Sequence, residues 1–202
     1  NIVGIKTASI IETICTCAAI GFTILFIACI VRYVTNGGGS GTLFDPTAFY
    51  NPENFQIKGT LAASAVLCAS FVGFDAVTTL AEEAKDPQKV MGKAIMGVVI
   101  GAGVIFAIVA YFSQIAWPEA YANIEDPDTG IFELFPHIGM SWLGTVFFIV
   151  DNCGSFVCAL AGMGAVSRIL YGMGRDNILP KKFFGKVSPK FQTPVNNIVL
   201  TT

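Results

Sequence analysis

The chain has 202 residues, of which 53% are hydrophobic and only 13% are charged, and its formal net charge is -2. This balance lies outside the usual range of a soluble globular domain, and the weak net charge gives no reason to expect a nucleic-acid partner. The composition therefore predicts an all-α polytopic membrane protein in contact with the lipid bilayer.

Apolar windows with few charges predict four spans, at about 10–34, 57–84, 94–118 and 140–171, with a further span starting from about 195. Each window can cross a hydrocarbon core of ~30 Å, which requires about 20 mostly apolar residues. Ten of the twelve basic residues fall on one side of this topology, before the first span or after the second and fourth. The positive-inside rule makes that side cytoplasmic.

The first span leads into an external loop over residues 36–56. Its glycine run, Gly37 to Gly41, neither follows a strand nor opens a helix with a lysine, so a flexible linker is favoured over a phosphate cradle. The six cysteines lie inside apolar spans and are interpreted as small hydrophobic residues. His137 is expected in a loop. We expect no metal, no cofactor and no enzymatic activity, because the chain carries no catalytic motif.

The second span is interrupted about halfway along by Gly73, Asp75 and the Thr78-Thr79 pair. A carboxylate near the middle of a membrane costs roughly 2.5 to 3.5 kcal/mol, and such residues usually face a cavity or a partner. Non-helical backbone at that depth is tolerated where it is buried in protein or lines a water-filled cavity. A broken helix at a binding site fits both conditions. The alternative is an ordinary helix in which Asp75 bonds to a neighbouring backbone.

Glu82 and Glu83 follow near the inner end of this span, where the helix dipole does not favour anions. They either form part of an internal gate with a basic partner or are simply solvated. Asp86-Pro87 ends the helix and starts the next one, since proline suits a first helical turn.

The third span carries Gly97 and Gly101, which favour close helix packing. The loop over residues 119–136 is acidic without a lysine or arginine. It could attract a cationic solute, although external loops ordinarily lack basic residues, and that second explanation is preferred.

Asp151 interrupts the fourth span. It lies almost one turn before Gly154, which begins a face of small residues with Cys158 and Gly162. Asp151 is therefore either the counter-charge of a cationic substrate or hydrogen-bonded to Asn152 or Ser155.

Two blocks of sequence resemble one family. Gly73-Phe74-Asp75-Ala76-Val77, followed by Ala81-Glu82-Glu83 and Lys85-Asp86-Pro87-Gln88, is similar to the sixth helix of amino acid-polyamine-organocation (APC) superfamily permeases. The run from Ser167 to Asn177, with Thr193-Pro194-Val195-Asn196-Asn197, resembles the exit of their eighth helix and the loop after it. Among these permeases the likeness is greatest to bacterial putrescine importers and cationic amino acid permeases.

The resemblance implies a fragment of a leucine-transporter-type inverted-repeat fold, covering about helices 5 to 8 and the start of 9. The chain begins at Asn1 without methionine and stops as an apolar run starts, so we expect an internal piece whose remaining helices belong to the same transporter. The resemblance also implies secondary active transport by alternating access. The expected location is the cell membrane, as a multi-pass protein of the bacterial inner-membrane type.

By resemblance, the unwound zone of the sixth helix contacts the substrate. Together with the counter-charge candidate, the substrate-binding residues are expected to be Ala69, Ser70, Val72, Gly73, Phe74, Asp75 and Asp151. The gating or proton-carrying candidates are Asp75, Glu82, Glu83 and Arg168.

The two carboxylates favour a small cationic amine, a polyamine such as putrescine or a cationic amino acid. Zwitterionic neutral amino acids are one alternative, and a non-transporting membrane scaffold or sensor on the same fold is another. Some proton-coupled members carry a lysine midway along the fifth helix, where this chain has Ala18, Ala19 and Ile20. Coupling to a proton or to a sodium ion therefore stays open.

Overall fold

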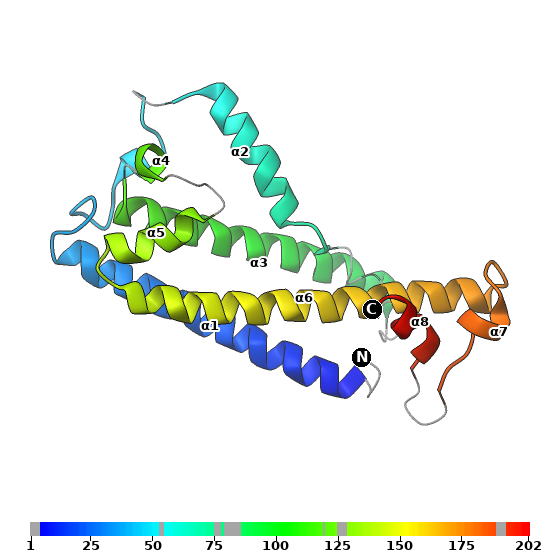
Figure 1. Ribbon diagram of the computed structural model, residues 1–202. Coiled ribbons are helices and arrows are strands. Elements are labelled where there is room, and N and C mark those ends of the chain that lie inside the picture. Colours follow the sequence, from blue (N-terminus) through cyan, green and yellow to red (C-terminus); the bar gives the residue numbers. More distant parts are fainter. Residues whose placement is uncertain are drawn as a thin grey trace. The chain divides into compact units, whose positions relative to one another are not determined.

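The computed structural model of the chain describes residues 5–52, 55–74, 78, 86–118, 120–124, 129–188 and 193–202. Every regular element within these ranges is a helix (Figure 1), which confirms the prediction of an all-α fold. In chain order the helices are α1 (Ile5–Thr35), the 3-10 helix η1 (Pro46–Ala48), α2 (Ile57–Ser70), α3 (Pro87–Ala116), α4 (Ala120–Asn123), α5 (Gly130–His137), α6 (Ser141–Arg175), α7 (Lys181–Phe184) and α8 (Val195–Leu200).

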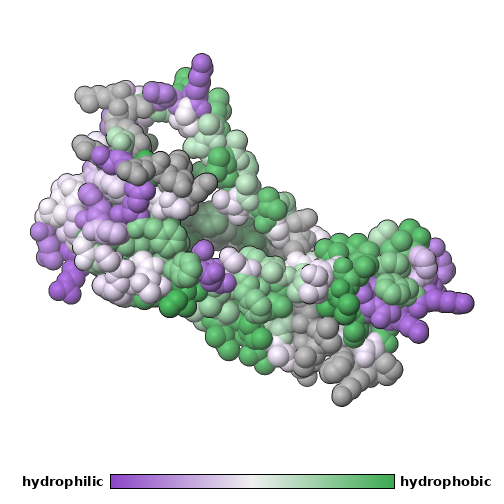
Figure 2. All heavy atoms as spheres, in the orientation of Figure 1, coloured by the Kyte–Doolittle hydropathy of each residue, from purple (hydrophilic) through white to green (hydrophobic). Residues whose placement is uncertain are grey.

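Three of the described helices, α1, α3 and α6, are long and apolar enough to cross a membrane. At a rise of 1.5 Å per residue, a helix of 30 residues is about 45 Å long, which exceeds a hydrocarbon core of ~30 Å. Their apolar side chains face outward: Ile14, Ile24 and Phe148 are all more than half exposed. Figure 2 shows hydrophobic residues over the long helices and hydrophilic residues gathered where α6 runs into α7. A surface of this kind suits lipid rather than water.

The helices extend beyond the apolar windows that predict the spans. The segment before residue 10 is already helical from Ile5, α3 begins at Pro87 rather than near residue 94, and α6 continues to Arg175. Hydropathy detects only the part of a helix that matches the hydrocarbon core, because lysine and arginine can continue the helix into the polar layer. Pro87 opens α3 as predicted, with the Lys89 and Val90 amides donating to the carbonyl of Asp86 at 3.0 Å.

The chain forms two compact units. Unit 1 contains residues 1–19, 73–95 and 150–202, and unit 2 contains residues 20–72 and 96–149. Each unit therefore takes one part of α1, of α3 and of α6, and unit 2 alone contains α2, α4 and α5.

The core of unit 2 is apolar and rich in aromatic rings. Phe135 of α5 is 1% exposed and lies edge-on to Phe26 of α1, with ring centroids 6.2 Å apart. Phe147 of α6 lies 5.6 Å from Phe135 and 5.6 Å from Phe22. The buried members of this core are Phe26, Ile30, Val34, Ile115, Ala116, Leu134, Phe135, Ile138 and Leu143. Interlocking rings thus hold α1, α5 and α6 together within this unit, and α3 joins the core through Ile115 and Ala116.

The glycine-rich segment after α1 is a packed turn, and not the flexible linker that its composition predicts. Gly37, Gly39 and Gly41 have φ values of +88°, +57° and +71°, in the left-handed region that favours glycine. A Cβ atom on Gly39 would overlap the carbonyl groups at the end of α3. The Ser40 amide donates to the Ile115 carbonyl at 2.9 Å. Glycine is required here because two backbones approach each other closely.

His137 is the last residue of α5 and does not lie in a loop as predicted. Its ring stacks on Trp117, with centroids 4.2 Å apart and planes 11° apart. The acidic loop after the third span therefore contains helical structure that folds back onto the end of α3. Composition did not reveal α5, because a helix of eight residues is too short to produce a clear period.

Candidate functional site

The interruption predicted in the second span is present. Helix α2 ends at Ser70 after 14 residues, although the apolar sequence continues. The Phe71 amide donates to the Cys68 carbonyl at 3.2 Å, and the Val72 amide donates to the Ala69 carbonyl at 3.1 Å. Hydrogen bonds between residues three apart are those of a 3-10 turn, which often ends an α-helix. Gly73 then adopts φ +100°, a conformation that other residues rarely reach. The sequence therefore terminates the helix through its backbone, without a polar side-chain cap.

The end of α2 is held against α3 by an aromatic contact within unit 2. The Phe71 ring lies edge-on to the Phe106 ring, with centroids 5.5 Å apart and planes 75° apart. A Cβ atom on Gly103 would stand 3.7 Å from the tip of the Phe71 ring, at ordinary van der Waals distance, so the ring packs directly over this glycine of α3. Sequence analysis missed this contact. Its only sequence signal is a glycine about one turn before a phenylalanine on α3.

The residues around the interruption are open. Ala69 and Ser70 are exposed on the last turn of α2, Val72 is 83% exposed, and Phe74 is 44% exposed. Among the described residues, none other than the chain neighbours of Gly73 has an atom within 4 Å of the place that a Cβ atom on Gly73 would occupy. The interruption thus offers backbone groups and two apolar side chains to whatever covers it.

The acidic residues that accompany the interruption in the sequence, Asp75, Glu82 and Glu83, lie outside the described residues. Their predicted roles in binding a substrate or carrying a proton are untested by the geometry. Of the remaining candidates, Ala69, Ser70 and Val72 belong to unit 2, whereas Gly73, Phe74, Asp151 and Arg168 belong to unit 1.

Asp151 lies in the uninterrupted helix α6 and has an exposed side chain. It therefore causes no break in the backbone, unlike the sequence around Gly73. The small-residue faces near it and on α3 are open as well, since nothing stands within 4 Å of a Cβ atom built on Gly154, Gly162, Gly97 or Gly101. The close helix packing that these glycines predict is not made by the described residues of this chain.

Arg168 is half-buried near the end of α6, next to Ser167, which is buried and belongs to a hydrogen-bonded cluster in unit 1. We call this cluster the amide clamp; it consists of Ser167, Phe184 and Asn197. The side-chain Nδ2 of Asn197 donates to the carbonyl of Phe184 at 3.0 Å and makes a longer contact of 3.4 Å with the carbonyl of Ser167. Asn197 is completely buried, and its Oδ1 has no partner among the described residues.

The amide clamp explains why the two halves of the second sequence block occur together. Ser167 opens that block and Asn197 closes it 30 residues later. Gly174 supports the arrangement, because a Cβ atom there would stand 2.7 Å from the backbone of Phe184 and Gly185. Asn177 makes the intervening turn with φ +61°, a conformation that asparagine tolerates better than most residues. The residues of this block therefore form one packed connection between α6, α7 and α8.

Within the described residues, no group of three or more histidine, cysteine, aspartate or glutamate side chains could hold a metal ion. The cysteines of the described chain are free thiols, in keeping with their interpretation as small hydrophobic residues.

The comparisons with known proteins agree on one family of membrane transporters. The sequence pattern of the family described as "Amino acid permease" matches residues 1–202. The low-affinity putrescine importer of Escherichia coli (strain K12) is 30% identical over 99% of this chain and 44% of its own length. The Arabidopsis thaliana protein named cationic amino acid transporter 7, chloroplastic, is 32% identical over 86% of this chain and 30% of its own length.

The relatives differ in the solutes for which they are named. A branched-chain amino acid permease of Bacillus subtilis (strain 168) is 26% identical over 95% of this chain and 38% of its own length. The chain thus spans less than half the length of these curated relatives. No solved structure matches it. The matched family and relatives are transporters and not enzymes.

Proposed function

Since this chain belongs to the amino acid permease family, we propose that it forms part of a secondary transporter that carries a small amine across the membrane by alternating access. The observation that supports this most is the end of α2 at Ser70, followed by a glycine at φ +100°, in an otherwise apolar span. Broken helices of this kind place backbone donors and acceptors at the middle of a membrane, where a polar solute needs them. An uninterrupted scaffold helix has no such requirement.

We propose that the interruption contacts the substrate directly. The exposed turn at Ala69 and Ser70 and the backbone of Val72 and Gly73 would supply polar groups, and the half-exposed Phe74 ring would pack on the apolar part of the solute. Asp75 in the sequence just beyond, and Asp151 on α6, would balance a positive charge on the substrate. Coupling to a proton through Asp75, Glu82 or Glu83, with Arg168 as a gating partner, belongs to the same proposal, with a sodium ion as the alternative.

We propose a polyamine such as putrescine, or a cationic amino acid, as the substrate class. Support comes from the names of the first relatives and from the carboxylates at positions 75 and 151. Neutral amino acids form the second candidate, since one relative is a branched-chain amino acid permease. The clustering of basic residues after α6 supports a cytoplasmic location for α7, and the bacterial relatives support an inner-membrane location.

The direct test is uptake of radiolabelled putrescine by the full-length protein that the gene encodes, in cells that lack their own importers. Unlabelled lysine, arginine and alanine serve as competitors. We expect saturable uptake that excess alanine leaves unchanged. Inhibition by lysine or arginine would indicate a site shared with cationic amino acids. Absence of putrescine uptake, with the protein demonstrated in the membrane, would contradict the polyamine assignment.

A further inference from the structure

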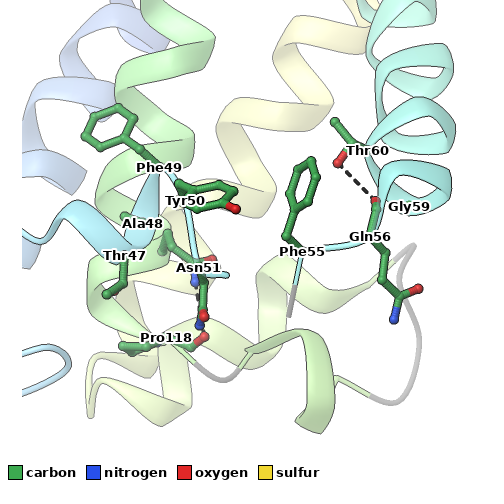
Figure 3. Close-up of a pocket in the computed structure, with 11 residues that line it drawn as sticks. Thr47, Ala48, Phe49, Tyr50, Asn51, Phe55, Gln56, Gly59, Thr60 and Pro118 are labelled. Atoms are coloured by element: carbon green, nitrogen blue, oxygen red, sulfur yellow. Dashed lines mark hydrogen bonds between the residues drawn. The ribbon is translucent and has the colours of Figure 1, made fainter. Parts of the chain in front are cut away.

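A cavity lies in unit 2, between the segment that begins at η1, the beginning of α2 and the end of α3 (Figure 3). Its volume of about 530 Å³ falls within the range of small-molecule sites, about 300 to 1,000 Å³. None of its lining residues belongs to the interruption at the other end of α2. It is therefore separate from the site proposed above.

Aromatic rings form one side of this cavity. Tyr50 and Phe55 have ring centroids 5.4 Å apart and planes tilted by 54°, and Phe49 stacks on Tyr111 of α3 with centroids 5.0 Å apart. Figure 3 shows the Phe49, Tyr50 and Phe55 rings around the hollow. These three side chains remain 73%, 59% and 49% exposed; one face of Phe49 is covered by Tyr111, and Tyr50 and Phe55 present ring surface to a ligand.

The segment that carries these rings is anchored on α3. The Tyr111 hydroxyl donates to the Leu43 carbonyl at 2.9 Å and accepts from the Asp45 amide at 3.1 Å. Asp45 in turn caps η1 by accepting from the Thr47 amide at 2.9 Å and the Thr47 hydroxyl at 2.6 Å. The start of the segment and the Phe49 ring are thus fixed on α3, which lowers the entropic cost of ordering this side of the cavity around a ligand.

The charges around the cavity favour a cation. No described lining residue is a lysine, arginine or histidine, and the amide side chains of Gln56 and Gln114 carry oxygens that can accept from an ammonium N–H. Lys58 is exposed and does not line the cavity. Thr47 lines the cavity, and its hydroxyl donates to the Asp45 carboxylate, which lies just outside the lining. The Thr47 hydroxyl first, and then the Thr47 amide, hold the pKa of that carboxyl below its ordinary value, so it is ionised at neutral pH.

We propose that this cavity binds an organic ammonium ion, at a site additional to the interruption in α2. The faces of Tyr50 and Phe55 attract the cation through their ring quadrupoles, and the amide oxygens orient its N–H groups when it has them. The binding itself needs no transport, so the inference does not rest on the proposed function.

The test is binding of tetramethylammonium to the full-length protein in nanodiscs, followed by saturation-transfer NMR. This probe has no N–H group, so it reports contact with aromatic faces and with charge. We expect saturable binding that the double substitution Tyr50→Leu with Phe55→Leu weakens by about fivefold to thirtyfold, the effect of losing two exposed cation–π contacts. Tyr50→Phe, which keeps the ring, should retain the affinity.

Phe44→Leu is the matched control, because Phe44 is a ring of the same loop that is even more exposed, at 77%, and does not line the cavity. It should leave binding unchanged. Asp45→Asn should weaken binding a few-fold, less so at high salt, because a nearby exposed charge is screened. The inference is overturned if tetramethylammonium does not bind, or if the double variant, with an unchanged circular dichroism spectrum, binds as the unsubstituted protein does. A variant without uptake, such as one at Gly73, should still bind the probe.

Discussion

The two units of this chain are stabilised in different ways. Unit 2 is built around nine buried apolar residues with interlocking rings, whereas the buried residues near the end of α6 in unit 1 include Ser167, Thr193 and Asn197. Apolar helices gain little hydrophobic free energy from meeting one another in lipid, because lipid tails are equally apolar. Shape complementarity therefore stabilises unit 2, and directed hydrogen bonds stabilise the amide clamp. The two should respond differently to the same kind of substitution.

The largest effect is expected in the aromatic core. Phe135→Ala removes a ring that is 1% exposed and contacts Phe26 and Phe147. The cavity should destabilise the protein by about 3 to 5 kcal/mol, as for buried rings elsewhere. The measurement is reversible unfolding of the full-length protein in mixed micelles. Phe148→Ala is the control, since Phe148 is 57% exposed on the same helix as Phe147, and it should cost far less. Equal losses would mean that lipid-facing rings matter as much as packed ones.

The amide clamp should be next in size. Asn197→Leu keeps the volume but leaves the Phe184 carbonyl without its donor, which typically costs about 1 to 3 kcal/mol for a buried group. Asn196→Leu is the matched control, because Asn196 is only half-buried and its bond to the Phe183 carbonyl, at 3.2 Å, is exposed. Thermal unfolding should show the larger shift for position 197. A larger shift at position 196 would contradict the role assigned to Asn197.

A smaller effect should come from the ring that holds the end of α2. Phe71→Leu removes the edge-on contact with Phe106, and such pairs contribute about 0.5 to 1.5 kcal/mol beyond the area that they bury. Hydrogen exchange at the amides of residues 71 and 72 should accelerate. A double-mutant cycle with Phe106→Leu isolates the contact, and a coupling free energy near zero would show that the two rings act independently.

The smallest effect concerns Asp45. Thr47→Val removes the hydroxyl that is the main cause of the lowered Asp45 pKa, so the pKa should rise toward its ordinary value. Because the folded pKa is depressed, the capping interaction is complete above the ordinary carboxyl range and is lost as the pH falls through the folded pKa. Carbon-13 NMR of the Asp45 carboxyl checks this. A titration unchanged by the substitution would mean that the backbone bond alone sets the pKa.

The sequence predicted the parts of the fold that depend on composition and backbone chemistry. Long apolar windows predicted four spans, three of which contain the membrane-length helices α1, α3 and α6 of the described chain. Gly73, with Asp75 and the Thr78-Thr79 pair, predicted the interruption of the second span, where Gly73 adopts φ +100°. The sequence could not predict α5 or the role of Gly39. Helix α5 is too short to give a clear helical period of hydrophobic residues. The role of Gly39 depends on its close approach to the end of α3, about 75 residues away in the sequence.

The candidate site was predictable only in outline. The resemblance pointed to residues from Ala69 to Asp75, and their contact with a substrate stays a prediction. In the described part of that stretch all residues except Phe71 are exposed. The contact of Phe71 with Phe106 and Gly103 could not be predicted, because these residues become neighbours only when α2 packs against α3. The amide clamp was visible as a sequence motif, but its physical basis, one buried amide bonded to two carbonyls, requires the fold.

The central claim is that the interruption at Gly73 is the functional element of this chain. The most direct measurement compares amine uptake by Gly73→Ala and Gly139→Ala in the full-length protein, at equal amounts in the membrane. Both glycines have positive φ, +100° and +72°, and in the described part of the chain a new Cβ on either would meet no atom within 4 Å beyond its chain neighbours, so both substitutions impose mainly backbone strain. The account predicts loss of uptake for Gly73→Ala and near-normal uptake for Gly139→Ala. Equal activity of the two variants would contradict it.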